Sequence, residues 1–265
     1  MSVNGREQQI FDLLCQHGSL TIQQLSEFLG VSPSSVRRDL GDLREHRFIQ
    51  RTHGGATLFN VVSYTPLPIH SPSVDPNEAR TIAHRALELI GRGDVIGLSG
   101  GRFCTELALH MRLHEGITVV TNAVNVAAEL VALPGIQVIV TGGTLDPRSF
   151  ELVGQVAQQS LNGIRMHRYF VGTDGITVEH GMTNHNEAAT LVAREFIKHS
   201  DQTIVLADSS KFKRSNLSQV VPISEISCIV TTDRVPKAII SQFEQAGVKC
   251  LVEPCKECVG EEEIV

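Results

Sequence analysis

Arginines and hydroxyl residues near the N-terminus have the chemistry that contact with nucleic acid requires. Arg37 and Arg38 follow Ser34 and Ser35 within the run PSSVRRDL. Guanidinium groups donate hydrogen bonds to guanine edges and to phosphates, and hydroxyl groups donate to phosphate oxygens. We therefore predict that one surface of this region contacts double-stranded DNA. The residues assigned to that surface are Thr21, Ser32, Ser34, Ser35, Arg37, Arg38, Arg51 and His53.

Two short helices joined by a tight turn are expected to present these side chains. Apolar residues recur at helical spacing at Leu20, Ile22, Leu25 and Leu29, and again at Val36, Leu40 and Leu43. Thr21 is the expected N-cap of the first helix, and Gly30 is expected to end it in a left-handed conformation. Ser32 is expected to cap the second helix, with Pro33 at its first position, where no N–H is needed.

The flanking residues favour a winged helix-turn-helix over residues 1–58. Residues 6–16 carry Ile10, Leu13 and Leu14 at helical spacing, which predicts a preceding helix. Residues 49–58 read as a β-hairpin that turns through Gly54-Gly55. The alternative is a small helical hairpin with an ordinary solvated face. In a helix-turn-helix the second helix lies in the major groove, and this arrangement predicts direct DNA contact.

A second set of polar residues and glycines follows the short apolar runs of the rest of the chain. Small residues let backbone N–H groups approach an anion, and a helix N-terminus adds partial positive charge. Lys211 supplies a full charge for a phosphate, while Asp174, Asn186 and Glu187 can accept hydrogen bonds from sugar hydroxyls. Each loop alone is consistent with a plain turn between a strand and a helix. Together they predict a ligand site made of Ser99, Gly100, Gly101, Arg102, Thr121, Asn122, Gly142, Gly143, Asp174, Glu187 and Lys211.

Alternating strands and helices are expected to position that site. Apolar runs predict strands at 95–98, 118–121, 138–141, 169–171, 203–207, 228–231 and 249–252. Helical patterns lie at 79–90, 105–114, 125–133, 155–161, 187–199 and 236–245. This order predicts a mainly parallel α/β sheet, and ligands of such sheets bind at the carboxyl ends of the strands. We expect a proline-rich linker over 59–78, a sensor domain over 79–255 and a disordered tail over 256–265.

Composition limits the class of protein. The 265 residues are 42% hydrophobic and carry a net charge of −6, which on its own does not favour nucleic acid. Residues 31–58 hold five arginines and three acidic residues, a local charge of +2. Affinity for DNA rises with the number of phosphates neutralised, so we expect a homo-oligomer, a dimer or tetramer, on one DNA site.

The chain shows no sign of a membrane or secreted protein. It has no stretch of about 18 apolar residues that would span a bilayer, and residues 1–6 do not resemble a signal peptide. Its six scattered cysteines suit a reducing compartment. We predict a cytoplasmic protein that contacts no membrane and needs no cofactor or metal.

The combined motifs resemble DeoR-type bacterial transcriptional repressors over about residues 5–252. The run SVRRDL followed by HGGA resembles the family's DNA-binding domain, and VVTNAVNVAAEL, VIVTGGTLDPRSFELVG, GTDGITVEHGMTNHNEA and VLADSSKFKRS resemble its sensor domain. The resemblance implies a sensor fold similar to ribose-5-phosphate isomerase, a recognition helix at 32–43 and nucleoid association when bound to operator DNA. It implies a repressor of a sugar-catabolism operon that a phosphorylated sugar releases, with motifs closest to the amino-sugar and sugar-alcohol branch.

One motif departs from the family pattern. Members commonly carry Asp-Ser-Gly-Thr-Thr after the first sensor strand, whereas this chain has Ser99-Gly100-Gly101-Arg102-Phe103. Arg102 would then bind a phosphate bidentately in place of the threonines. Alternatively, Arg102 and Phe103 narrow the site, and the sensor responds to another ligand.

Parts of the sequence are also compatible with two other functions. A sugar-phosphate isomerase would use Glu187 or Asp174 as a base and Lys211 to hold phosphate, but an enzyme has no use for a DNA-binding module. A metal or redox sensor would use the C-x4-C-x2-C spacing of Cys250, Cys255 and Cys258. That spacing lacks a complete ligand set, and scattered reduced thiols explain it as well.

Overall fold

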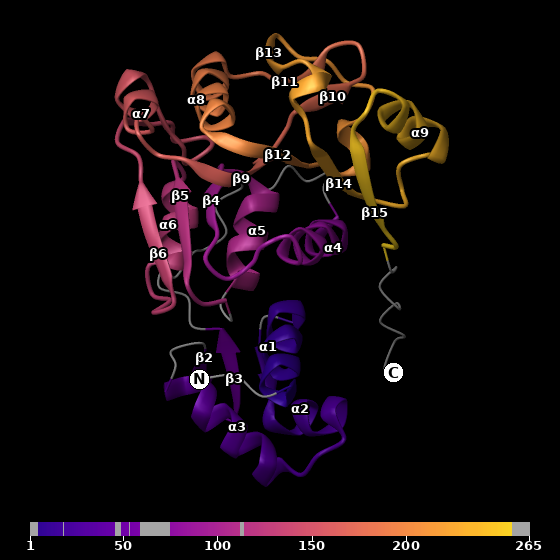
Figure 1. Ribbon diagram of the computed structural model, residues 1–265. Helices are drawn as coiled ribbons and strands as arrows, with labels where there is room; N and C mark the ends of the chain where they lie inside the picture. The colour runs from indigo at the N-terminus through magenta and orange to yellow at the C-terminus, as the bar shows by residue number, and fades with distance from the viewer. Residues whose placement is uncertain are drawn as a thin grey trace. The chain divides into compact units, whose positions relative to one another are not determined.

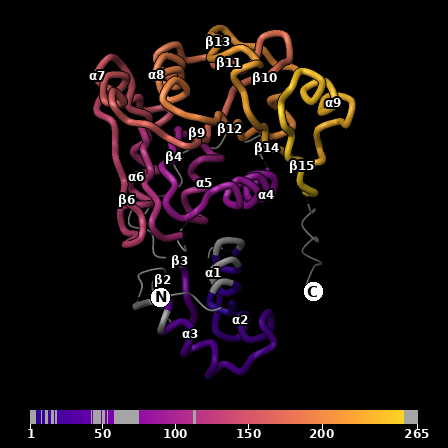
Figure 2. Tube along the Cα trace, in the orientation of Figure 1, coloured from indigo at the N-terminus to yellow at the C-terminus, as the bar shows by residue number. Residues whose placement is uncertain are grey.

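A computed structural model describes residues 5–17, 19–45, 49–52, 54–58, 75–111 and 114–255. The chain divides into two compact units, Met1–Tyr64 and Thr65–Val265, each considered separately below. Figure 1 labels their helices and strands, and Figure 2 follows the same path as a Cα trace. None of the described helices has the length and apolar composition that a bilayer span requires.

The N-terminal unit is a three-helix domain with a small antiparallel sheet. Its helices are α1 (Gly5–His17), α2 (Ile22–Leu29) and α3 (Pro33–Glu45). Its strands are β1 (Ser19–Thr21), β2 (Ile49–Thr52) and β3 (Gly55–Leu58), in the order β1-β3-β2. The core contains Ile10, Leu14, Leu25, Val36, Leu40, Leu43 and Ile49. The predicted winged helix-turn-helix is confirmed, with β1 as an unpredicted third strand.

Local capping explains where α2 and α3 begin and end. Thr21 and Gln24 form a capping box, in which the Gln24 N–H donates to Thr21 Oγ1 at 3.2 Å. Gly30 ends α2 with φ 63°, a left-handed conformation that favours glycine. Ser32 Oγ accepts the Ser35 N–H at 3.3 Å at the start of α3. The predicted caps are confirmed, so residues 21–35 fix the helix-turn-helix largely by themselves.

The predicted wing turn through Gly54-Gly55 is wrong at Gly55. Thr52 pairs with Gly55, the first residue of β3, so Gly55 is a strand residue and not a turn residue. Gly55 belongs to β3, and a Cβ there would lie 2.1 Å from the Leu20 carbonyl oxygen. Gly55 is therefore required by the close pairing of β3 with β1. The other glycine, Gly54, has φ 100° and serves the turn itself.

The C-terminal unit is built on a parallel sheet of seven strands in the order β15-β14-β12-β9-β4-β5-β6. These strands are β4 (Val95–Leu98), β5 (Ile117–Thr121), β6 (Ile136–Val140), β9 (Met166–Gly172), β12 (Ser200–Leu206), β14 (Cys228–Thr232) and β15 (Lys249–Glu253). Along the chain, β5 and β6 extend the sheet on one side of β4, and β9 and later strands extend it on the other. The order of the strands thus reverses between β4 and β9.

Helices cover both faces of this sheet (Figure 1). One face carries α4 (Pro76–Leu87), α5 (Arg102–His110) and α6 (Val124–Leu130), and the other carries α7 (Gln155–Gln159), α8 (Glu187–Lys198) and α9 (Lys237–Gln245). Strand residues that pack with α7, α8 and α9 alternate along β9, as Tyr169 and Val171 show, and are joined by Val120, Val205 and Ile229 from other strands. The predicted parallel α/β class is confirmed.

Short antiparallel strands that the sequence did not predict complete the unit. The strands β10 (Gly175–Thr177), β11 (Gly181–Asn184) and β13 (Ser218–Val221) form one sheet, and β7 (Thr144–Leu145) pairs with β8 (Leu152–Val153). Two single-turn 3-10 helices are η2 (Ser209–Lys211) and η3 (Ile223–Glu225).

The sensor unit begins earlier than Ala79, where we predicted it. Asp75 caps α4 by accepting the Asn77 N–H at 2.9 Å, and the helix starts at Pro76. Glu78 is 4% exposed and packs within the unit. Asp75 therefore caps α4 and residues 76–78 belong to that helix and not to a linker, and residues 59–74 lie outside the described ranges. Helix α5 likewise starts at Arg102, ahead of the predicted Thr105.

Candidate functional site

The exposed face of α3 carries the predicted DNA-contacting residues. Ser34, Arg37 and Arg38 are exposed on the side opposite the buried Val36 and Leu40. No described residue forms a hydrogen bond or ion pair with the Arg38 guanidinium group. The Arg38 side chain is therefore available to an external phosphate or base edge.

Hydroxyl groups gather at the N-terminus of the same helix. Ser32 Oγ lies 2.8 Å from Ser34 Oγ and 3.1 Å from Ser35 Oγ. Together with the first N–H groups of α3, they form a surface suited to phosphate. Thr21 uses its hydroxyl in the capping box, at the start of α2. Arg51 lies on β2, and the predicted contact His53 lies outside the described residues.

A buried carboxylate fixes α3 against α1. Arg6 donates to Asp39 through Nε at 2.6 Å and through Nη2 at 2.8 Å, and Asp39 is 2% exposed. The Asp39 hydrogen bond raises the pKa of Arg6, as expected for a bidentate guanidinium–carboxylate contact. Asp39 therefore sets the orientation of the helix while its neighbour Arg38 faces solvent. Sequence reasoning missed this role, because the partners are separated by α2.

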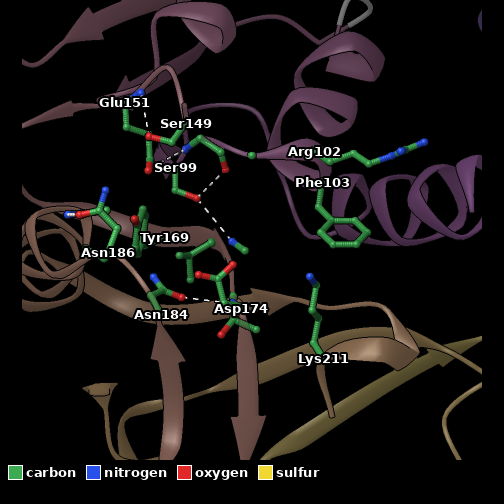
Figure 3. A pocket seen from close by; sticks show the side chains of 17 residues that line it. Ser99, Arg102, Phe103, Ser149, Glu151, Tyr169, Asp174, Asn184, Asn186 and Lys211 are labelled. Atoms are coloured by element: carbon green, nitrogen blue, oxygen red, sulfur yellow. Dashed lines mark hydrogen bonds between the residues drawn. The ribbon is translucent and has the colours of Figure 1, made fainter. Parts of the chain in front are cut away.

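A cavity of about 280 Å³ lies at the carboxyl ends of β4 and β9, where the order of the strands reverses. Ligands of open parallel sheets bind at such a reversal. Figure 3 shows side chains converging on it from several loops. They come from the β4–α5 loop, the end of β9, η2, the segment before β8 and the start of α8.

Six of the predicted ligand residues line this cavity, and five do not. Those that line it are Ser99, Gly100, Gly101, Arg102, Asp174 and Lys211. Those outside its lining are Thr121, Asn122, Gly142, Gly143 and Glu187. The residues that line the cavity follow β4, β9 or β12, which are neighbouring strands. Thr121 and Asn122 lie at the end of β5, Gly142 and Gly143 follow β6 at the edge of the sheet, and Glu187 begins α8.

The ends of β5 and β6 are covered by other parts of the chain. The Asn122 carbonyl accepts the Leu152 N–H at 2.7 Å, and the Asn122 side chain donates to the Leu152 carbonyl at 3.2 Å. Thr121 donates to the Leu98 carbonyl at 2.7 Å and is buried. These bonds place the segment that precedes β8 over the end of β5. That segment, and not Thr121 or Asn122, supplies the cavity wall.

The other three predicted residues lie outside the cavity lining for simpler reasons. A Cβ on Gly142 would lie 2.8 Å from Val156 Cγ1, and one on Gly143 would lie 3.1 Å from Ala157 Cβ, so both glycines approach α7 and not the cavity. Glu187 is exposed as the first residue of α8, while its neighbour Asn186 lines the cavity as the N-cap of that helix.

Glu151 is the main cavity residue that sequence reasoning missed. Its Oε1 accepts the Gly100 N–H at 2.9 Å, and a Cβ on Gly100 would lie 2.5 Å from Glu151 Cγ. Burial raises the pKa of Glu151 above the ordinary range of a glutamate. The residue before it, Phe150, has φ 60°, a strained conformation for a non-glycine residue. No spacing in the sequence signals this residue, because its partner is about fifty positions away in the chain.

Asp174 and Lys211 are the charged groups of the wall opposite Glu151 in Figure 3. Asp174 Oδ2 accepts a hydrogen bond from the His185 N–H at 3.0 Å, and the Asp174 N–H donates to Asn184 Oδ1 at 3.2 Å. Within the described ranges, the Lys211 ammonium group has no hydrogen-bonding or ionic partner. Lys211 is therefore free to bind an anion.

Arg102 lies on the rim and does not point into the cavity. Figure 3 shows its side chain extending away from Ser99, Asp174 and Lys211. Its charge helps to lower the pKa of Asp75 at the start of α4, after the Asn77 N–H and the Arg234 guanidinium group. The predicted bidentate phosphate contact from Arg102 is not supported by this conformation.

The cysteines do not form a visible reactive centre. Burial raises the pKa of Cys104 and of Cys250 to about 12, which keeps both thiols protonated at neutral pH. Cys258 lies outside the described residues, so the C-x4-C-x2-C motif is seen only in part. Among the described residues, no three His, Cys, Asp or Glu side chains are grouped to hold a metal ion.

Comparisons with known proteins match both units of the chain. Residues 6–61 match the DeoR-like helix-turn-helix domain, and residues 75–233 match the DeoR C terminal sensor domain. A protein from Escherichia coli O157:H7, named for repression of the aga operon, is 32% identical over 253 residues, which are 93% of each chain. The HTH-type transcriptional repressor GlcR of Bacillus subtilis is 32% identical over 244 residues, 92% of this chain and 93% of that one.

Among solved structures, ribose 5 phosphate isomerase A from Neisseria gonorrhoeae is similar over 54% of this chain and 56% of that one, with a TM-score of 0.40 and 19% identity. The two family matches together span both described units. The chain belongs to the DeoR family of DNA-binding transcriptional repressors of sugar-related operons.

Proposed function

We propose that a phosphorylated sugar binds the sensor cavity and releases this repressor from a sugar-catabolism operon. The observation that carries the proposal is Lys211, a cation that has no partner among the described residues, on the wall of a polar cavity of about 280 Å³. An ammonium group in such a place binds phosphate as a point charge. Asp174 and Asn186 then accept or donate hydrogen bonds with the hydroxyl groups of the sugar.

A buried carboxylate offers a route from the cavity to the DNA-binding unit. Glu78 Oε1 accepts the Ser209 N–H at 3.1 Å and the Thr232 hydroxyl at 2.6 Å. Ser209 is in η2 with Lys211, and Glu78 is in α4, the first described element after the wing. A ligand that moves Lys211 would act on α4 through Glu78, and on DNA through residues 59–74. A ligand shifts the equilibrium only if it prefers one of the two arrangements.

We further propose a homo-oligomer, a dimer or tetramer, that acts in the bacterial cytoplasm on nucleoid DNA. The local charge of +2 in residues 31–58 gives one copy a weak electrostatic hold on DNA. Two copies would place two α3 helices in successive major grooves, about one helical turn apart.

A regulator explains the site better than an isomerase does. The named relatives are transcriptional repressors. Glu187, one of the two bases that an isomerase would use, does not line the cavity. Asp174 does, but it is partly exposed and already accepts hydrogen bonds from His185. We propose that the cavity binds its ligand without converting it.

Thermal-shift measurements test the proposal directly. Ligands that bind only the folded protein raise its melting temperature, so a panel of sugar phosphates would be compared with the matching free sugars. We expect at least one phosphate to stabilise the protein, and its free sugar not to. Lys211→Ala should abolish that shift, whereas Lys237→Ala, an exposed lysine at the start of α9, should preserve it. Equal shifts with the free sugars, or with Lys211→Ala, would contradict a phosphate site at Lys211.

A further inference from the structure

The β4–α5 loop has its first cavity-facing amide already occupied. Glu151 Oε1 accepts the Gly100 N–H at 2.9 Å, and its Cγ lies where a side chain on Gly100 would stand. Anions that bind glycine-rich loops take such backbone N–H groups as their donors. An incoming phosphate would have to displace the Glu151 carboxyl group from Gly100.

The rest of that end of the cavity directs no cationic side chain at a phosphate. Gly101 precedes α5 without any side-chain cap, so the first N–H groups of the helix remain possible donors, while Arg102 extends away from the cavity. Phe103 contributes an apolar ring that is 5% exposed. Ser99 holds its hydroxyl among Gly100, Cys104 and Gly172, each within 3.4 Å of Oγ. At this end the Glu151 carboxyl group therefore competes with a phosphate for the Gly100 N–H.

The segment that carries Glu151 is held firmly in place. The Phe150 N–H donates to the Asp146 carbonyl at 2.9 Å, and the Asp146 N–H donates to the Glu151 carbonyl at 2.8 Å. Asn186 Nδ2 donates to Asp146 Oδ2 at 2.7 Å, which ties this segment to α8. The left-handed backbone of Phe150 persists only because these contacts determine it. The Glu151 carboxyl group is thus a fixed part of the wall.

We propose that Glu151 determines which end of the ligand faces which wall of the cavity. Hydroxyl groups of a sugar phosphate donate to the Glu151 carboxyl group at the α5 end, and the phosphate binds Lys211 at the other end. Figure 3 shows Glu151 and Lys211 on opposite sides of the cavity. The raised pKa of Glu151 agrees with a carboxyl group that gains stability from a donor such as a ligand hydroxyl. This inference rests on the proposed function and assigns the orientation of its ligand.

Inorganic phosphate is a suitable probe, because it reports the anion site without the sugar. Its binding would be measured by calorimetry on the full-length wild type and on Lys211→Ala. The same measurement would be made on Lys211→Ala/Glu151→Ala, a variant that no longer has a carboxyl group at the Gly100 N–H. A third variant, Lys211→Ala/Glu151→Gln, keeps an acceptor oxygen there without the charge. Melting temperatures without ligand would show that each variant is folded.

We expect phosphate to bind the wild type and to bind Lys211→Ala at least tenfold more weakly. Lys211→Ala/Glu151→Ala should bind phosphate at least tenfold more tightly than Lys211→Ala does, because the Gly100 N–H becomes free. Lys211→Ala/Glu151→Gln should bind phosphate as weakly as Lys211→Ala does. Any of three results would overturn the proposed orientation. These are undiminished phosphate binding by Lys211→Ala, no recovery of binding in Lys211→Ala/Glu151→Ala, and no phosphate binding by the wild type.

The test separates this inference from the proposed function. If sugar phosphates stabilise the wild type while the variants fail in the ways described, only the orientation is wrong. If no sugar phosphate stabilises the wild type, the proposed function fails, and the orientation fails with it.

Discussion

The α3 face takes its polar side chains from residues 32–38, whereas the sensor cavity takes its own from residues that extend from Ser99 to Lys211. On α3, serines gather at the helix start and Arg38 has no described partner. In the cavity, Glu151, Ser99 and Asp174 are all hydrogen-bonded to neighbouring loops. The helix presents exposed groups on a rigid support, and the cavity holds groups that position one another.

This difference has a consequence for regulation. A surface built on one helix changes little when a distant ligand binds, so α3 acts by its position and not by its shape. The walls of a cavity built from several strand ends can move relative to one another, because each wall belongs to a different loop. Glu78 bonds to Ser209 and Thr232, so it senses such movement at two strand ends at once.

The largest expected effect tests whether the two units are separate in stability as well as in structure. Leu40 is buried in the α3 core, and Leu40→Ala should destabilise the N-terminal unit by about 2–5 kcal/mol. The sensor unit has its own core and should keep its melting temperature. Calorimetry would resolve the two transitions. Leu217→Ala, at an 88% exposed residue, is the control that should change neither. An equal decrease in the melting temperatures of both transitions would contradict the idea that the two units have separate cores.

Glu78→Ala tests the route between the cavity and α4. Loss of the acceptor leaves the Ser209 N–H and the Thr232 hydroxyl unpaired, at a cost of about 1–3 kcal/mol of stability. We expect the variant to bind DNA and sugar phosphate, while the ligand weakens DNA binding less than in the wild type. Fluorescence anisotropy of labelled operator DNA, with and without ligand, measures this coupling. Glu78→Gln keeps an acceptor oxygen and should retain most of the coupling between ligand binding and DNA binding. Full coupling in Glu78→Ala would exclude this route.

Arg38→Ala tests the independence of the DNA face. It should weaken operator binding by about 1–3 kcal/mol if the guanidinium group contacts a base, and by a similar factor on all sequences if it contacts phosphate. The thermal shift with sugar phosphate should be unchanged, because Arg38 is in the other unit. Titrations against specific and scrambled DNA separate the two kinds of contact. Unchanged affinity for both DNAs would remove Arg38 from the interface.

The two sites also differ in how far the sequence could predict them. The caps, the turn and the buried face of the helix-turn-helix lie within a few residues of one another. Local chemistry was therefore enough to interpret Thr21, Gly30, Ser32 and Val36. The parallel sheet followed from alternating elements. Residues at the strand ends were also recognised, but the order of the strands was not, so edge residues such as Gly142 were assigned to the cavity.

Glu151 shows what local reasoning does not reach. It enters the cavity because β8 pairs with the short strand β7 and because Leu152 bonds to Asn122. Strands of two residues have no periodicity to detect, and a hydrogen bond across about thirty positions has no spacing rule. The same applies to Arg6 and Asp39, which meet only after α2 has folded between them.

The smallest expected effect concerns the stability contributed by Glu151. Its folded pKa is raised by burial above the unfolded value of 4.5, so the folded state binds the proton more tightly. The free energy of unfolding should therefore fall as pH rises from 4.5 through the folded pKa, since the unfolded state then binds fewer protons. Glu151→Gln removes this decline, so its stability relative to the wild type should increase from acidic to neutral pH.

Urea unfolding at several pH values measures the difference. Glu179→Gln, whose side chain is 82% exposed, should follow the wild-type curve. A Glu151→Gln curve parallel to that of the wild type would mean that the carboxyl group is well solvated, and the cavity would then be a more open surface, closer in kind to the α3 face.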